Sequence, residues 1–302
     1  MEITRYALIS NINHKRKIHT MKKVLFSMAC ALLVASGTPS FAADKKTAAK
    51  TVQIICSQGF QGPELWDKHE FPIDKKGYIT IFDGKTMAGW RGYGKTYIPS
   101  RWVVEDGTIH FIGNQDAEKA KGKEGGDIIF AHKFKNFEVS IDWKICKGGN
   151  SGIFYLAQEV ANDKGGLEPI FISAPESQVL DNANHPDAKL GKDGNRMSSS
   201  LYDMIPAKPQ NQKPYGQWNN TTIRVDNGTI THFQNGKQVL QYKVWTPEWI
   251  ELLQTSKFSE KAWPTAFKLL KNVGGPNHEG FIGLQDHGDD VWYRNIKVKM
   301  LD

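Results

Sequence analysis

The stretch Phe137-Glu138-Val139-Ser140-Ile141-Asp142-Trp143-Lys144-Ile145 indicates the fold class of this 302-residue chain. Apolar and polar residues alternate through all of it, which is the pattern of a β-strand with one buried face and one solvated face. A strand of this kind pairs with neighbours in a sheet, and the sheet packs its apolar face against a core. We therefore expect a β protein whose other strands are marked by turn sequences.

Two tight turns are visible on the C-terminal side of this strand. Asn227-Gly228 and Asn235-Gly236 are residue pairs that tolerate positive φ at both central positions of a hairpin turn. They predict a meander of strands at Thr221–Asp226, Thr229–Gln234 and Lys237–Tyr242. Many short strands joined by such turns favour a β-sandwich.

The C-terminal part of the chain contains a further strand and one exception to the β pattern. Residues Val291–Val298 alternate as a strand, but the alternation shifts phase between Tyr293 and Ile296, which predicts a β-bulge. The exception is Pro247–Asn272, where the apolar residues suggest one or two short helices. The expected fold is an all-β sandwich with a short helical insertion.

The net charge of +7 is concentrated at the N-terminus. Residues 1–42 hold six basic residues and one acidic residue, so the remainder of the chain carries a net charge of only +2. Nucleic-acid-binding domains usually carry a strong basic patch, and this remainder has no such excess. We therefore expect no nucleic-acid partner.

The N-terminal segment has the features of a secretory signal. Met21-Lys22-Lys23 supplies a charged start, residues 24–34 form an apolar run too short to span a bilayer, and Ser40-Phe41-Ala42 provides small residues for cleavage. We expect a signal peptide at 21–42, preceded by an upstream extension at 1–20. The predicted location is therefore periplasmic or secreted.

The mature chain is expected to hold one domain after a short lead-in. Residues 43–70 are Lys/Ala-rich at first and are interpreted as a linker and lead-in, and the sandwich domain is placed at 71–302. No further segment is apolar enough to cross a membrane. Export implies an oxidising compartment, and Cys56 and Cys146 remain after cleavage, so a disulfide between them is open but not established.

Polar residues gather in two short stretches. Pro175–Asn182, followed by His185, begins like a strand and ends like a turn, and Leu284–Gly288 contains Gln285 and His287. In a regular strand Glu176 and Gln178 share a face while Asp181 points the other way. A bulge after Gln178 would bring all three to one face.

Several segments in register resemble one family. They are Ile81–Lys85 with Gly89-Trp90, Trp102–Gly107, Asn136–Glu138, Gly148–Tyr155, Pro175–Asn182, Ser200–Tyr202, Gly216–Asn219, Leu284–Gly288 and Arg294–Ile296. Over residues 71–302 the chain resembles the 3-keto-disaccharide hydrolases, also described as 3-keto-glucoside 1,2-lyase / 3-keto-2-hydroxy-glucal hydratase. The resemblance implies a concanavalin/glucanase-like jelly roll, in agreement with the strand pattern.

The resemblance also implies a substrate and a chemistry. The partner would be an oligosaccharide or glycoside oxidised at C3, because the ketone acidifies the proton on C2 and an enolate can then expel the group on C1. Such a site needs a base, an acid, and donors or a metal for the enolate. The expected catalytic residues are Glu176, Asp181 and His287. The expected substrate-binding residues are Asn150, Gln178, His185, Tyr202, Trp218, Gln285 and Arg294.

Three questions stay open at the level of sequence. The spacing of Glu176, Gln178 and Asp181 resembles the acid strand of retaining β-glucanases, with Gln178 in place of the middle carboxylate, so ordinary glycoside hydrolysis is an alternative. A sugar-binding lectin on the same scaffold is another. No metal-binding motif is evident, although a divalent ion held by carboxylates and His287 is a further possibility.

Overall fold

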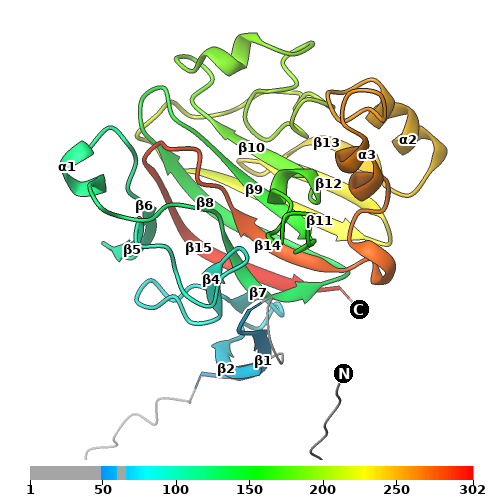
Figure 1. Ribbon diagram of the computed structural model, residues 1–302. Coiled ribbons are helices and arrows are strands. Elements are labelled where there is room, and N and C mark those ends of the chain that lie inside the picture. The colour runs from blue at the N-terminus through cyan, green and yellow to red at the C-terminus, as the bar shows by residue number, and fades with distance from the viewer. Residues whose placement is uncertain (1–48, 60–65, 302) are drawn as a thin grey trace, which may run out of the picture. The chain divides into compact units, whose positions relative to one another are not determined.

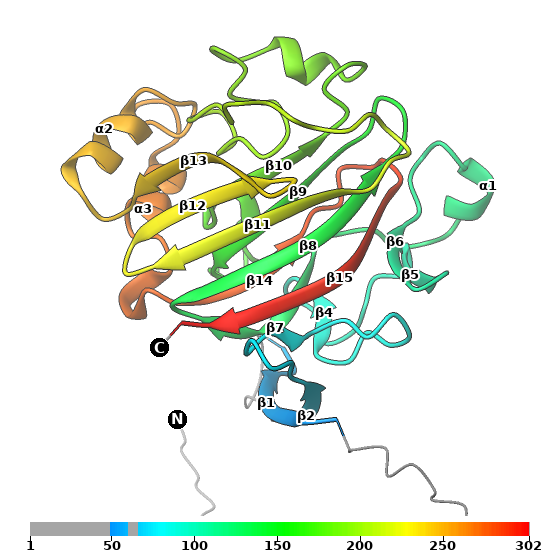
Figure 2. The ribbon, with the colours of Figure 1, turned by 180° about the vertical axis from the view of Figure 1, so that it is seen from behind.

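Two antiparallel sheets form the body of the protein in this computed structural model, which describes residues 49–59 and 66–301. The predicted extension at 1–20 and signal peptide at 21–42 lie outside the described residues. Figures 1 and 2 show the two sheets as layers, seen from opposite sides. The smaller sheet has the order β10 (Glu176–Leu180), β9 (Asn150–Ala157), β14 (Gly280–Leu284), β7 (Ile128–Phe134) and β4 (Trp90–Gly92).

The larger sheet is centred on the strand that indicated the fold class. Its order is β13 (Lys237–Lys243), β12 (Thr229–Gln234), β11 (Asn219–Asp226), β8 (Phe137–Ile145), β15 (Val291–Met300), β6 (Thr108–Phe111) and β5 (Trp102–Glu105), with β3 (Ile79–Thr80) paired to β15. Alternate residues of β8 are buried from end to end, as predicted. The expected β-sandwich is therefore confirmed.

The core lies between the sheets. Ile141 and Trp143 of β8 belong to the same buried cluster as Ile153 and Tyr155 of β9. A second, smaller cluster lies on the other face of the smaller sheet and includes Phe154. Since both faces of β9 are covered, every residue of that strand is buried.

The predicted turns and the predicted bulge are confirmed. Asn227 and Gly228 have φ of 47° and 80°, and Asn235 and Gly236 have 48° and 79°, so both hairpins use the left-handed region that these residues tolerate. In β15 the pairing with β8 shifts register between Arg294 and Lys297. The local rules that predicted these features depend only on neighbouring residues.

Helices are few and short. The predicted insertion contains α2 (Pro247–Gln254) and α3 (Pro264–Lys271), and the other helices within the described residues are α1 (Ala117–Ala120), η1 (Ile170–Ile172), η2 (Pro186–Lys189) and η3 (Gly275–Asn277). No helix among the described residues has both the length and the apolarity needed to cross a membrane. The two cysteines considered for a disulfide, Cys56 and Cys146, are both free thiols.

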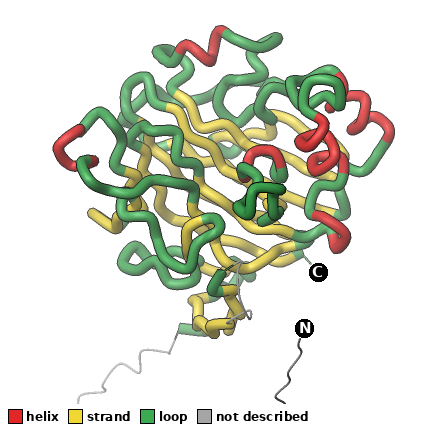
Figure 3. Tube along the Cα trace, viewed as in Figure 1, coloured by secondary structure: helices red, strands yellow, loops and turns green. Residues whose placement is uncertain are grey.

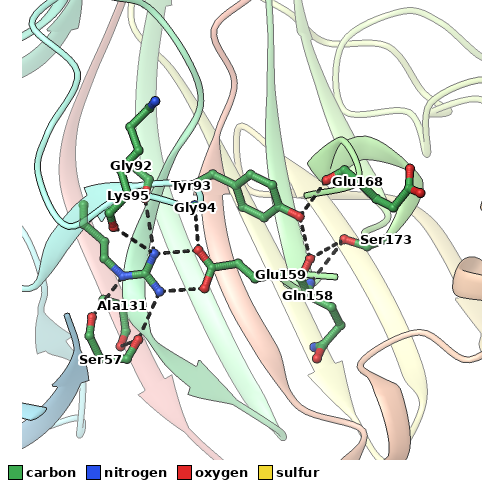
Figure 4. Close-up of polar contacts among 11 residues, drawn as sticks. Ser57, Gly92, Tyr93, Gly94, Lys95, Ala131, Gln158, Glu159, Glu168 and Ser173 are labelled. Atoms are coloured by element: carbon green, nitrogen blue, oxygen red, sulfur yellow. Dashed lines mark hydrogen bonds and ion pairs between the residues drawn. The ribbon is translucent and has the colours of Figure 1, made fainter. Parts of the chain in front are cut away.

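Part of the segment interpreted as a linker and lead-in forms a hairpin of β1 (Thr51–Ser57) and β2 (Trp66–Pro72). Arg91 of β4, which forms a buried ion pair with Glu159, connects this hairpin to the sandwich through Ser57. Arg91 Nη1 and Nη2 donate to Glu159 at 2.6 and 2.8 Å, and Arg91 Nε donates to the Ser57 carbonyl at 2.9 Å. Figure 4 shows Glu159 and Ser57 on either side of this guanidinium group.

Candidate active site

Six of the ten predicted site residues gather on the outer face of the smaller sheet. Glu176 and Gln178 of β10 pair with Phe154 and Gly152 of β9, and alternation places all four on the face away from the main core. Loops and short helices, rather than strands, lie over this face (Figure 3). Between them is a pocket of about 250 Å³.

Six predicted site residues line this pocket. They are Asn150, Glu176, Gln178, Tyr202, Gln285 and His287. They come from the start of β9, from β10, from the loop after it and from the loop after β14, so residues more than a hundred positions apart meet because β9 lies between β10 and β14. The strand order thus brings together the two polar stretches of the sequence.

Glu176 is the buried acid of the pocket. Its side chain lies over Gly152, where a Cβ would approach Glu176 Cδ to 2.8 Å, so only glycine leaves room for the carboxyl group. Burial raises the pKa of Glu176 to about 8, the charge of Lys257 opposes that rise, and the charge of Asp127 adds to it. A carboxyl group that titrates near neutral pH is suited to proton transfer.

The amides of the pocket have unused hydrogen-bonding capacity. Both side-chain polar atoms of Gln178, together with Asn150 Oδ1 and Gln285 Oε1, are buried and find no hydrogen-bond partner among the described residues. Asn150 Nδ2 donates to His287 Nε2 at 3.4 Å. A buried polar atom without a partner is costly to the fold, so a cluster of them is typical of a site that binds a polar ligand.

Asp181 does not join this group. The pairing of β10 with β9 runs without a break from Glu176 to Leu180, so the bulge considered after Gln178 is absent and Asp181 points to the opposite face. Its carboxylate accepts hydrogen bonds from Gly148 N, Ala183 N and Asn184 Nδ2, at 2.8, 3.2 and 2.7 Å. These bonds organise the turn that follows the strand.

His185 lies beside the pocket, outside its lining. It caps η2 by accepting a hydrogen bond from Asp187 N at 3.1 Å, and its ring lies 6.4 Å from that of His287. Burial lowers the pKa of His185, with the nearby charge of Asp187 acting in the opposite direction. A neutral imidazole in this position is available as a hydrogen-bonding group near the pocket.

Trp218 and Arg294 lie on the other sheet, apart from the pocket. The guanidinium carbon of Arg294 is 3.8 Å from the centre of the Trp218 ring. Arg294 pairs in register with Asp142, which faces solvent on β8, so the two residues cover the outer face of the larger sheet. Neither residue lines this pocket, because alternation along β15 directs Arg294 away from both the core and the pocket, so their expected role in substrate binding stays a prediction.

Five lining residues were not predicted. They are Asp127, Phe171, Lys257, Phe258 and Asp286. The carboxylate of Asp286 accepts backbone hydrogen bonds from Gly126 and Gly288. The sequence signal for Asp127 is a single acidic residue directly before the apolar strand β7, and only the strand order reveals that it reaches the site.

The helical insertion contributes one side of the pocket. Lys257 follows α2, and its ammonium group lies 4.3 Å from the centre of the Tyr202 ring. Phe171 packs edge-on against Trp263, with ring centres 5.7 Å apart, and Phe258 lies 6.4 Å from the same ring. The pocket therefore has an aromatic side with one cation and a side rich in amides.

A metal site is not evident in this part of the protein. Across residues 49–59 and 66–301, no three His, Cys, Asp or Glu side chains come together in a set that could hold a metal ion. The sequence left open a divalent ion held by carboxylates and His287. These ranges contain no group of three such side chains that could hold it.

Comparisons with known proteins agree with the fold and show the family. A 3-keto-disaccharide hydrolase of Bacteroides thetaiotaomicron is 59% identical over 292 residues, which cover 93% of this chain and all of the relative. A solved Parabacteroides distasonis chain, provisionally described as a glycosyl hydrolase, is 26% identical with a TM-score of 0.61 and covers 75% of this chain and 95% of its own. A second structure from that organism, at 24% identity and a TM-score of 0.51, covers 74% of this chain and 99% of its own and shares the fold. Residues 77–299 match the 3-keto-alpha-glucoside-1,2-lyase-like domain, and the chain belongs to that family.

Proposed function

We propose that this protein is an exported enzyme that cleaves 3-keto-glycosides by removing the proton on C2. Elimination of the group on C1 would give a 3-keto-2-hydroxy-glucal, and addition of water would complete a net hydrolysis. The name of the Bacteroides relative supports a 3-keto sugar as substrate. The family to which the chain belongs supports elimination across C1 and C2 as the route.

The observation that carries the proposal is the position of Glu176 among unpaired amides. The buried carboxyl group, with its pKa raised to about 8, lies in one pocket with Asn150, Gln178 and Gln285. Hydroxyl groups of a sugar would supply the partners that these amides lack among the described residues. A volume of about 250 Å³ suits one sugar unit better than a whole disaccharide.

In this mechanism the residues of the chain bind, orient and move protons. Glu176 takes the proton from C2, and Asn150, Gln178 and Gln285 orient hydroxyl groups on the ring. His287, hydrogen-bonded to Asn150, and the ammonium group of Lys257 are the donors available to the oxygen on C3 as negative charge develops there. Such donors act more strongly in a pocket than in water.

The proposed location rests on the N-terminal sequence. The charged start, the short apolar run and the small residues Ser40 and Ala42 support export. N-terminal sequencing of the protein from its native cell tests this: a mature chain that begins near Ala43 is expected, whereas an intact leader would contradict export.

A substrate labelled with deuterium on C2 tests the proposed chemistry. We expect a normal isotope effect on cleavage of the labelled 3-keto-glucoside, or loss of the label to solvent, and we expect Glu176→Gln to reduce turnover by about 10²–10⁴-fold. Rapid cleavage of the unoxidised glucoside with full retention of the label would instead support an ordinary glycosidase. Binding of both sugars without turnover would support a lectin.

A further inference from the structure

Most carboxylates around the pocket are already occupied by hydrogen bonds from the protein. Both oxygens of Asp286 accept backbone N–H groups, from Gly126 at 2.7 Å and from Gly288 at 2.9 Å. Asp181 and Asp289 likewise have donors on both oxygens. A carboxylate held in this way shapes a loop, and its oxygens are not available to a substrate.

Asp127 differs from these residues. Its Oδ1 accepts the Asp286 N–H at 2.9 Å, which fixes the orientation of the carboxyl group, and no described residue donates to its Oδ2. Glu176 also has no side-chain hydrogen bond to a described residue, and both residues line the pocket. Among the acidic side chains that line the pocket, Asp127 and Glu176 are therefore the pair with oxygens open to a ligand.

The strand order places these two carboxyl groups on opposite sides of the pocket. Glu176 belongs to β10 and Asp127 directly precedes β7, with β9 and β14 between them. Because adjacent strands lie roughly 4.8 Å apart, three steps separate the two backbones by about 14 Å. The side chains reach into the pocket from its two flanks, so a bound sugar would have one carboxyl group on each side.

We infer that Asp127, rather than Asp181, is the second proton-transfer residue of this pocket, and that it transfers the proton at the oxygen on C1. The inference rests on the proposed function, because that reaction requires proton transfer at two positions of the sugar. The pKa of Asp127, raised to about 7 mainly by burial, fits a group that gives and takes a proton near neutral pH.

The two carboxyl groups complete a balanced cycle that starts with Glu176 ionised and Asp127 protonated. Because the pKa of Glu176 (about 8) lies above that of Asp127 (about 7), this is the minor of the two forms that carry one proton. The Glu176 carboxylate takes the C2 proton, the electron pair of that bond forms the enolate, and the enolate expels the oxygen on C1 while the Asp127 carboxyl group protonates it. The C1–O bond breaks and the alcohol leaves. In the second half the Asp127 carboxylate takes a proton from water as the water oxygen bonds to C1, and Glu176 returns its proton to C2. One water is consumed, and both carboxyl groups regain their starting states.

Leaving groups of different acidity test this role. A methoxide leaving group needs a proton from an acid, whereas 4-nitrophenolate leaves without one. For Asp127→Asn we expect the rate with methyl 3-keto-glucoside to fall about 10²–10⁴-fold, while the 4-nitrophenyl substrate loses less than about tenfold. Exchange of the C2 proton with D₂O, followed by NMR, should persist in this variant and be lost in Glu176→Gln.

The asparagine in Asp127→Asn retains the oxygen that accepts the Asp286 N–H, so the variant is expected to fold, and a thermal melt checks this.

The wild-type enzyme provides an independent measurement: the high-pH fall in kcat/KM should be present for the methyl substrate and absent for the nitrophenyl substrate. If Asp127→Asn lowers the rate equally with both leaving groups, or with neither, the role of Asp127 is overturned. Failure of the proposed function is seen separately, as an absence of C2 exchange in the wild-type enzyme.

Discussion

The side chain of Glu176 fills the space beside Gly152, which lies on the neighbouring strand. A Cβ on Gly152 would lie 2.8 Å from Glu176 Cδ and 2.9 Å from Glu176 Cγ, closer than real contacts allow. Gly152 has an ordinary strand conformation, so the backbone itself would accept alanine. Position 152 must therefore be glycine because the Glu176 side chain needs the space. A methyl group at position 152 tests the role of Glu176 without changing the carboxyl group itself.

We expect Gly152→Ala to displace the Glu176 carboxyl group and to reduce kcat on a 3-keto-glucoside at least tenfold, since misplacing a reacting group by about 1 Å costs on the order of 10²-fold. Gly166→Ala is the matched control, because a Cβ there meets Asn162 only at 3.6 Å, away from the pocket. If Gly152→Ala retains full activity while folded, the carboxyl group of Glu176 has no fixed place in catalysis.

The features that the sequence predicted correctly depend on neighbouring residues. Alternation in Phe137–Ile145, positive φ at Asn227-Gly228 and the change of phase near Arg294 all follow from a few adjacent side chains. Asp181 was misplaced because its position depended on a bulge, and one extra residue turns every later side chain to the other face. The contribution of Asp127 depends on strand order, which is set by packing between distant segments.

The pH dependence of stability should report the buried state of Glu176. Its pKa is raised from 4.5 to about 8, so the native state keeps a proton that the unfolded chain has lost across this range. Stability linked to this group therefore falls as pH rises from about 4.5 to 8. The Glu176→Gln side chain stays neutral at every pH. The melting temperature of this variant minus that of the wild type should therefore increase from pH 5 to pH 8. A constant difference between the two would contradict the raised pKa.

The unpaired amide of Gln178 predicts a conflict between stability and activity. A buried polar group without a partner costs about 1–3 kcal/mol, so Gln178→Met should leave the melting temperature unchanged or higher. The same variant cannot form a hydrogen bond to the substrate at this position. We therefore expect kcat/KM to fall at least tenfold, because the site is shaped for a hydrogen bond that is no longer made.

Gln234 is the matched control for this variant. It is also a fully buried amide, but it is hydrogen-bonded to Ser198 at 2.8 Å. Gln234→Met should therefore destabilise the protein by about 1–3 kcal/mol in urea unfolding, because the partner is left unpaired. Equal destabilisation by the two methionine variants would show that the Gln178 amide has a partner in the folded protein.

The ion pair of Arg91 and Glu159 predicts a large loss of stability. Their side chains are only 4% and 6% exposed, so removing one charge leaves the other buried without its partner. Glu159→Gln should reduce the free energy of unfolding by about 3–5 kcal/mol. Glu70→Gln, an exposed change on strand β2 of the N-terminal hairpin, should have little effect in the same urea titration. Similar values for the two variants would mean that Arg91 is solvated.

Lys257 should set the position of the pH optimum. With two coupled carboxyl groups whose pKa values are about 7 and about 8, kcat/KM is expected to rise and then fall over a narrow range between these values, which belong to the pair. The charge of Lys257 lowers the pKa of Glu176. Lys257→Met should therefore move the profile toward higher pH.

Screening by solvent limits how far the pH profile shifts in Lys257→Met. Lys257 is exposed over part of its surface, so its field is screened, and added salt should move the wild-type profile in the same direction as the variant. Lys261→Met removes the same charge from the same helical insertion without touching the pocket lining. It should leave the profile in place. Identical profiles for the two variants would show that the charge of Lys257 does not act on the pKa of Glu176.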